Sequence, residues 1–286
     1  MRVGITSLFR DEARFLKEYI EFHKLVGIDV LYLQNNLSED DYMSVLAPYI
    51  ASGFVVLQQV TDNRAFTDGG MIFHVQNLAF DWAVNQAEKD GLDWLGLFNL
   101  DEFLYPIQER NIKNVLDKFG DNVGQIGINW QMFGHSNKVV APGELITEHL
   151  ILTQETDIEN RHVKPMVRPK AVKECTNPHY VTLYPEYISV NTHGQLREIS
   201  DVWPAWDLNI EYHVGPFDIP VRKDVMLLNH YTMRDLSFCE QKCQWYRQFG
   251  YGEDFIQWCK NRANDKENTV IHRFLPELKE RMNGQH

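Results

Sequence analysis

Apolar positions in the first hundred residues follow two alternating patterns. Short continuous apolar runs, typical of buried strands, are separated by longer segments in which apolar residues recur every three or four positions, as in amphipathic helices. Because crossovers of this length join parallel strands, the pattern predicts an α/β fold with a mostly parallel central sheet flanked by helices. The predicted strands are residues 3–8, 30–33, 54–57 and 94–98, and the predicted helices are residues 11–26, 38–50 and 71–87.

Two details sharpen the helix boundaries. Gly27 follows the first predicted helix and is a natural helix stop. The run 38–41, Ser-Glu-Asp-Asp, is expected to provide an N-cap and an acidic first turn for the second helix.

The pattern changes after Asp101. A further strand is predicted at residues 125–130, and residues 133–225 combine Pro, His, Asn and β-forming residues without a clear period. We interpret this irregular segment as loops and strands that line part of a cleft, because irregular segments of this length in compact domains are usually functional. Regular spacing resumes at Met226 and predicts C-terminal helices.

Polar residues follow the predicted strands of the first half. In open parallel sheets, ligands bind beyond the carboxyl ends of the strands, so these residues are expected to form one rim rich in carboxylates and amides. A glycine-rich dinucleotide fingerprint and a phosphate-binding loop are both missing, which argues against dehydrogenases and kinases. The rim residues are Arg10, Asp11, Asn35, Asn36, residues 61–64, and Asn99 with Asp101 and Glu102.

The charge balance narrows the possible partners. The 286 residues carry 28 Lys and Arg against 40 Asp and Glu, a net charge of −12, and no basic stripe is present. Nucleic acid is therefore not expected as a partner. A phosphate ligand must instead be held locally, and carboxylates at a strand end suit a divalent cation that neutralises a diphosphate.

The sequence also bears on location and redox state. No apolar run approaches the length of a membrane span, and charge soon interrupts the N-terminal apolar stretch. We expect a cytoplasmic protein with no transmembrane segment and at most weak peripheral membrane contact. The four cysteines lack zinc-type spacing and are expected to be reduced, with a metal cluster or disulfide as the alternative; they are Cys175, Cys239, Cys243 and Cys259.

Six short motifs occur in order between residue 3 and about residue 250. The first motif combines residues 10–12 and 19–23 with Gly27. The other five are residues 35–38, Gln76, residues 99–104, residues 177–179 and residues 229–231. With these motifs the chain resembles GT-A-type nucleotide-sugar glycosyltransferases, and most closely glycosyltransferase family 92 and its bacterial relatives. The resemblance implies a Rossmann-like GT-A fold in a single catalytic domain, residues 1–286. Its parts would be a nucleotide-binding half (1–105), an acceptor-side half (106–225) and a C-terminal helical segment (226–286).

The resemblance further implies an activity. Such enzymes transfer a sugar, here of the hexosyltransferase type, with inversion from a nucleoside diphosphate donor, with a UDP-sugar favoured. The acceptor would be a saccharide or glycolipid, and polysaccharide biosynthesis in a bacterial envelope or capsule is the implied setting. Two departures stand out: Asn99 replaces the first Asp of the Asp-x-Asp signature, and residues 133–138 differ from the relatives on the acceptor side.

Asp101 is the expected metal ligand because it follows directly on a predicted buried strand. The resemblance suggests His230 as a second ligand or a diphosphate contact, and a carboxylate beside a nitrogen ligand fits Mn²⁺, with Mg²⁺ next. Glu102 either orients neighbouring groups or pairs with a cation. Asn99 can accept a ribose hydroxyl or coordinate weakly but adds no charge, so an Asn99→Asp variant is expected to bind Mn²⁺ more tightly.

The remaining donor-binding candidates each have a structural alternative. Arg10 and Asp11 contact the base or phosphate, or they simply begin a helix. Asn35 and Asn36 bind a base edge or ribose, or they are turn residues. Gln76 either faces the donor or is a surface glutamine. Lys164 and Arg168 are the best local cations for a diphosphate leaving group, or they are solvated.

Inverting transfer also requires a general base for the acceptor hydroxyl. Glu148 is ranked first, followed by Glu144 and His135, with exposed loop residues as the alternative. Five aromatic residues of the irregular region either stack on sugar rings or belong to the core: Trp130, Phe133, Tyr180, Trp203 and Trp206.

Two other functions stay open at this point. A sugar nucleotidyltransferase would share this kind of sheet, although the basic glycine-rich N-terminal loop it needs is missing. A non-catalytic saccharide- or nucleotide-binding relative is suggested by Asn99, which removes one charge from the expected metal site.

Overall fold

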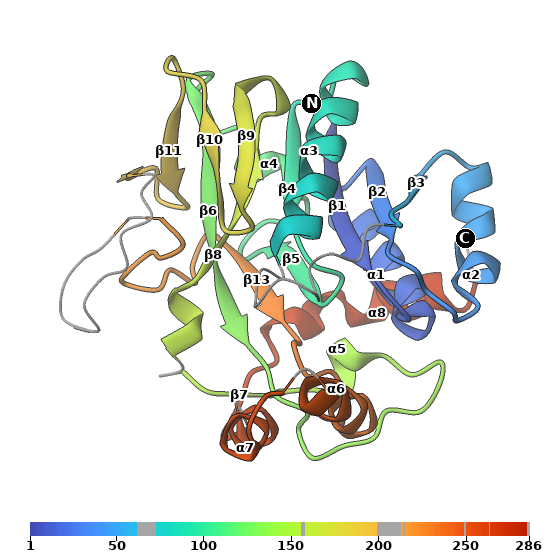
Figure 1. Ribbon diagram of the computed structural model, residues 1–286. Coiled ribbons are helices and arrows are strands. Elements are labelled where there is room, and N and C mark those ends of the chain that lie inside the picture. The colour runs from blue at the N-terminus through green and yellow to red at the C-terminus, as the bar shows by residue number, and fades with distance from the viewer. Residues whose placement is uncertain are drawn as a thin grey trace.

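The computed structural model (Figure 1) describes residues 1–61, 73–155, 158–198, 213, 215–248, 250–262 and 264–284. In chain order these residues form β1 (Val3–Phe9), α1 (Ala13–Leu25), β2 (Val30–Asn35), α2 (Tyr42–Ala51), β3 (Val55–Gln59), α3 (Phe73–Lys89), β4 (Trp94–Leu97), β5 (Glu102–Pro106), α4 (Lys113–Leu116), β6 (Val123–Met132), α5 (Ile146–His149), β7 (Leu152–Thr153), η2 (Ile158–Arg161), β8 (Val163–Val167), η3 (Pro169–Ala171), β9 (Val172–Asn177), β10 (Tyr180–Leu183), β11 (Ile188–Asn191), β12 (Leu196–Arg197), β13 (Met226–His230), α6 (Leu236–Gln248), α7 (Glu253–Asn261), β14 (Lys266–Glu267), η4 (Val270–Phe274) and α8 (Leu275–Met282).

The predicted α/β class is confirmed. The main sheet has the strand order β12-β11-β6-β8-β4-β1-β2-β3, with β13 joining β5 and β6. Strands β1 to β4 are parallel in the order β3-β2-β1-β4, which is the order of a Rossmann-like half. Strand β8 runs antiparallel between β4 and β6 and connects this half to the rest of the sheet.

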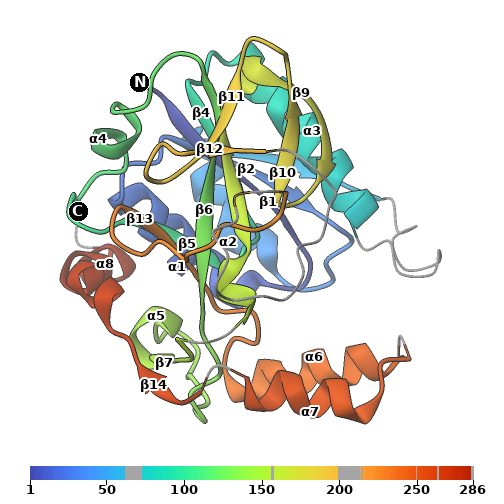
Figure 2. The same cartoon turned by 90° about the vertical axis from the view of Figure 1, so that its left-hand side faces the viewer.

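Alternation along the strands assigns side chains to the two faces of the sheet. Leu31 and Leu33 of β2 belong to the core beside α1 and α8, whereas Val30 and Tyr32 belong to the core beneath α3. Both sets are buried, which explains why β2 reads as a continuous apolar run. Figure 2 shows α3 on one side of the sheet and α1 with α8 on the other, with the α6–α7 pair projecting below.

One sequence-based expectation about the helices needs correction. The segment 38–41 does not supply an acidic first turn, because α2 begins only at Tyr42 and has no acidic residue there. Asp40 instead accepts the backbone N–H of Ala13 at 2.7 Å and so caps the start of α1. The irregular region contains the strands β7 to β12, as expected for a mixture of loops and strands, whereas β5 directly after Asp101 was not predicted.

Candidate functional site

Three potential metal ligands meet where β4 gives way to β5. Asp101 lies in the turn between these strands, and Glu102 is the first residue of β5. Strand β13 pairs antiparallel with β5 and places His230 directly opposite Glu102. One donor atom from each of the three residues lies within 4.8 Å of the others, and His230 Nε2 is 3.4 Å from Asp101 Oδ1.

The donor set fits a divalent cation. Glu102 Oε1 and His230 Nδ1 are buried without a hydrogen-bond partner. Because buried polar atoms are almost always paired in native proteins, such orphans indicate a ligand. Two carboxylates and one imidazole suit Mn²⁺ better than softer metals.

Charged side chains interact with this cluster. Burial by itself would raise the pKa of Asp101, but attraction to His230, with further help from Arg234 and Lys242, holds that pKa well below its usual value. Arg234 is almost completely buried and forms an ion pair with Glu12, whose pKa is raised by burial in spite of that partner. Asp101 is therefore ready to bind a cation as a carboxylate.

Asn99 belongs to a second group on the same rim. Its Oδ1 accepts hydrogen bonds from Gln76 and, at 3.5 Å, from Lys164 Nζ. Lys164 Nζ is also 3.9 Å from Glu102 Oε2, and both side chains are buried. Burial raises the pKa of Glu102 and lowers that of Lys164, and the attraction between the two opposite charges opposes both shifts.

A group of rings packs beside His230. Trp130 lies 4.4 Å from His230 between ring centroids, and 5.2 Å from each of His162 and His179. His179 donates from Nδ1 to the Val163 carbonyl at 2.8 Å, and burial, with repulsion from His162 and Lys164, keeps its pKa well below the usual value. The His179 ring is therefore neutral.

The first rim loops are joined to each other by their own side chains. Asp11 accepts the N–H of Glu39, while its own N–H bonds to Ser38 Oγ, and Arg10 lies beside it at 3.8 Å. Asn35 Nδ2 donates to Tyr42 and Gln59, and Asn36 Nδ2 donates to the Val60 carbonyl. These contacts fit the turn-forming alternative for the Asn pair. Residues 62–64 of the expected rim lie outside the described residues.

Arg168 does not belong to this rim. Strand β8 is antiparallel to β4, so the four residue steps from Lys164 to Arg168 carry the chain about 13 Å towards the amino ends of the parallel strands. There the guanidinium lies 4.2 Å over Trp94 and donates to the carbonyl of Val123. The expectation that Lys164 and Arg168 face one diphosphate is wrong, because strand direction separates them.

The three predicted general bases have partners on the C-terminal helices or in their own loop. Glu148 pairs with Lys279 of α8 at 2.6 Å. Glu144 accepts the N–H of Ala141, and His135 donates from Nε2 to the Lys260 carbonyl of α7 at 2.7 Å. None of these contacts joins them to Asp101. Among the aromatic candidates, Phe133 is buried in the main core, and Trp203 and Trp206 lie outside the described residues.

Sequence reasoning missed the roles of Glu12, Arg234 and Lys242. Glu12 stands in the 10–12 motif, but only the fold shows that it faces Arg234, which is 222 residues away in the chain. The available signal for Arg234 and Lys242 was their position shortly after His230, on the turn and helix that follow β13. Similarly, the motif residue His23 is structural: it bonds to the Tyr19 carbonyl and accepts the N–H of Leu104 on β5.

A Rossmann-like half-sheet with a carboxylate–histidine cluster at its carboxyl edge defines an α/β protein whose ligand site lies at the strand ends. Residues 2–244 match the family described as glycosyltransferase family 92, and the chain belongs to that family. Two plant members are similar. A Ricinus communis protein is 26% identical, and the match covers 59% of this chain and 29% of that protein. An Oryza sativa protein is 24% identical, and the match covers 79% of this chain and 32% of that protein. The chain thus spans less than a third of either relative.

Solved structures resemble the chain only distantly. Residues 1–349 of S. aureus TarS superpose with a TM-score of 0.41 and 10% identity, covering 91% of this chain and 69% of that one. The complex of the same TarS residues with UDP-GlcNAc superposes with a TM-score of 0.40 and 10% identity, and the match covers 91% of this chain and 70% of that one. Among the described helices of the present chain, none has both the length and the apolar composition needed to cross a membrane.

Proposed function

We propose that this protein is an inverting glycosyltransferase that uses a nucleoside diphosphate sugar, with UDP as the favoured nucleotide. The observation that carries the proposal is the convergence of Asp101, Glu102 and His230 at the carboxyl edge of the sheet in a member of family 92. The acceptor would be a saccharide or glycolipid. Bacterial polysaccharide biosynthesis in the cytoplasm remains the proposed setting.

In the proposed reaction, an acceptor hydroxyl attacks the anomeric carbon of the donor sugar. The new O–C bond forms as the bond from that carbon to the diphosphate oxygen breaks, the proton passes to a general base, and the nucleoside diphosphate leaves. A bound Mn²⁺ or Mg²⁺ would stabilise the negative charge that develops on the leaving diphosphate. Asp101 and His230 would hold this ion, and the buried carboxylate of Glu102 completes the donor set.

The remaining residues have supporting roles in the proposal. Lys164 lies on the rim and supplies a positive charge beside Glu102 and Asn99. Arg234 and Lys242, together with His230, keep Asp101 ionised. Arg10, Asp11 and Gln76 stay predicted donor contacts, and the general base stays a prediction among Glu148, Glu144 and His135.

Calorimetric titration with UDP and GDP, each with and without Mn²⁺, tests the proposal. We expect UDP to bind in a Mn²⁺-dependent manner, and Asp101→Asn or His230→Ala to weaken that binding at least about a hundredfold, since even indirect supports of a metal are worth about 10–100-fold. Asp121→Asn is the matched control, because Asp121 is fully exposed and lies beside Arg168 at the amino end of the parallel strands.

Several results would contradict the proposal. If neither nucleotide binds, the transferase function is wrong. Release of pyrophosphate from a nucleoside triphosphate and a sugar phosphate would favour a nucleotidyltransferase, and nucleotide binding without turnover of any donor would favour a non-catalytic relative. Inversion is checked by proton NMR of the product, in which the anomeric configuration of the transferred sugar should be opposite to that in the donor.

A further inference from the structure

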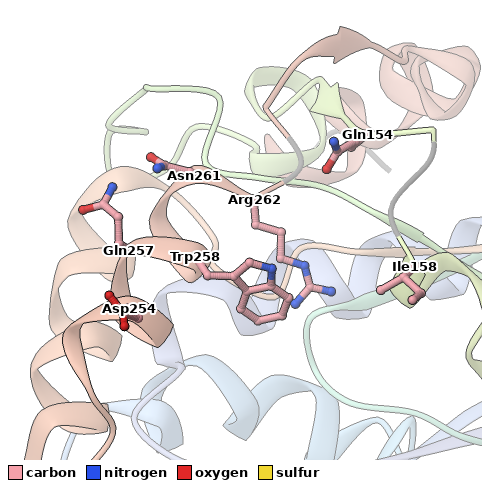
Figure 3. A pocket seen from close by; sticks show the side chains of 7 residues that line it. All are labelled: Gln154, Ile158, Asp254, Gln257, Trp258, Asn261 and Arg262. Atoms are coloured by element: carbon pink, nitrogen blue, oxygen red, sulfur yellow. The ribbon is translucent and has the colours of Figure 1, made fainter. Parts of the chain in front are cut away.

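A pocket of about 510 Å³ lies between α7 and the chain segment that follows β7 (Figure 3). Asp254, Gln257, Trp258 and Asn261 line one wall, and their spacing of i, i+3, i+4 and i+7 places them on one face of α7. Gln154 and Ile158 form the opposite wall, and Arg262 lies between the two walls beside Trp258. The volume is within the usual range for small-molecule sites.

The chemistry of this pocket suits a sugar ring. Trp258 keeps 44% of its surface exposed, although large aromatic side chains are normally buried. Arg262 covers part of the indole, with its guanidinium carbon 4.4 Å from the ring centroid, and so fixes its orientation. The side-chain amides of Gln154, Gln257 and Asn261 each offer donors and an acceptor for hydroxyl groups around such a platform.

Charge argues for a neutral ligand. Asp254 and Arg262 are the ionisable side chains among the lining residues, and Glu159 lies 3.9 Å from Arg262, so the pocket has no excess positive charge for an anion. The chain as a whole carries a net charge of −12, which disfavours an anionic glycan or an anionic membrane surface at this place.

A chain of contacts connects this pocket to the metal-ligand cluster. Arg262 Nη2 lies 3.9 Å from Glu159 Oε2, which in turn lies 3.1 Å from His162 Nδ1. The His162 ring lies 5.2 Å from Trp130, and Trp130 lies 4.4 Å from His230. The pocket is therefore linked to His230 through η2 and Trp130, and Glu159 and His162 belong to the irregular region predicted to line the acceptor side.

We propose that this pocket is a subsite for a neutral pyranose unit of the saccharide acceptor, with Trp258 as the stacking platform. The assignment to the acceptor rests on the proposed transferase function. In this subsite the apolar face of the sugar packs on the indole, and Asp254, Gln257 and Asn261 bond its hydroxyl groups.

Titration followed by NMR of the tryptophan indole N–H signals tests the subsite, with lactose, cellobiose and N,N′-diacetylchitobiose as probes. We expect at least one disaccharide to shift the Trp258 signal, which is identified by its loss in Trp258→Phe. Isothermal titration with the same disaccharide should show binding about tenfold weaker in Trp258→Ala, while Trp258→Phe retains most of the affinity. Tyr184→Ala is the control, because Tyr184 is also 44% exposed but lies on the turn after β10.

If none of the three disaccharides shifts the Trp258 signal, or if Trp258→Ala binds as tightly as the unmodified protein, the subsite is wrong. Gln257→Ala provides a second variant should Trp258→Ala fail to fold, and it should also weaken the disaccharide. Mn²⁺-dependent UDP binding should be unchanged in all these variants. A disaccharide that binds at Trp258 when no nucleotide binds would contradict the transferase and leave the pocket as a saccharide site.

Discussion

Asp101 remains ionised although only 14% of its side chain is exposed, because attraction to His230, Arg234 and Lys242 outweighs the cost of desolvation. Asn99, two residues earlier, is neutral, and its side-chain oxygen already accepts from Gln76 and Lys164. Because Asn99 replaces the first Asp of the Asp-x-Asp signature, the site lacks one negative charge at a position next to Lys164. At the scale of single residues, the charges of the site are balanced by partners that lie far apart in the sequence.

This arrangement refines the expected effect of Asn99→Asp. The new carboxylate should tighten Mn²⁺ binding, but by no more than about tenfold, because Lys164 lies 3.5 Å from that oxygen and neutralises part of the added charge. Calorimetric titration with Mn²⁺ measures the change. The double variant Asn99→Asp/Lys164→Met should gain more, and weaker Mn²⁺ binding in the single variant would contradict the argument.

His23 should make the stability of the protein depend on pH. Burial lowers its pKa from 6.5 to about 3, so the unfolded chain binds more protons than the folded protein between these values. Its contribution to stability is present above pH 6.5 and is lost as the pH falls towards 3. From pH 7 to pH 5 the loss should be about 2 kcal/mol.

Urea unfolding at both pH values measures this loss. In His23→Gln, the difference between the two pH values should shrink by about the same amount relative to the unmodified protein. An unchanged difference would mean that His23 is protonated in the folded state.

At the scale of elements, the surroundings of a helix end decide which residue types fit there. Gly27 follows α1 with a φ of +99°, and a Cβ at this position would lie 2.2 Å from Asn111 Oδ1. Gly53 follows α2 with a φ of +77°, but a Cβ there would meet nothing within 4 Å. Two glycines that look alike in the sequence as helix stops therefore differ in their surroundings.

This difference can be measured with two alanine variants. Gly53→Ala carries only the cost of a positive φ and should lower the free energy of unfolding by about 1 kcal/mol. Gly27→Ala adds a steric clash and should cost about 2 kcal/mol more. Urea unfolding compares the two variants, and equal losses would show that the contact with Asn111 relaxes freely.

At the scale of the whole molecule, the main sheet joins segments from the entire chain. Strand β13, from the C-terminal segment, pairs with β5 and β6 and delivers His230 to Glu102. Arg234 then pairs with Glu12 near the N-terminus. The three segments predicted from the sequence thus contribute strands to one sheet, and the first and third supply the metal-ligand cluster.

A chain that ends at residue 225 should therefore fail to form the native core. It lacks β13, which leaves β5 without this neighbour, and it lacks α8, which packs on α1. We expect a loss of cooperative thermal unfolding and of Mn²⁺ binding, followed by near-UV circular dichroism and calorimetry. A chain that ends at residue 282 is the control and should keep both, and cooperative folding of the shorter chain would contradict the prediction.

Local pattern explains which predictions were accurate. The strands β1 to β4 and the helices between them were predicted within a few residues, because a strand buried on both faces must be continuously apolar and an amphipathic helix must repeat its apolar positions. The placement of Asp101 at a strand end follows from the same pattern. The edge strand β12, its neighbour β11 and the short β5 lacked a clear period, since their burial depends on neighbours supplied by distant segments.

The sequence by itself determined the α/β class, the acidic rim and, through its motifs, the family, because periodicity and strand ends are local properties of the chain. Only the tertiary structure decided which candidates meet. It brought His230 to Asp101 through the antiparallel pairing of β13 with β5, and it sent Arg168 to the opposite end of the sheet through the reversed direction of β8. Strand direction and pairing partner depend on contacts between residues far apart in the sequence, which no local pattern specifies.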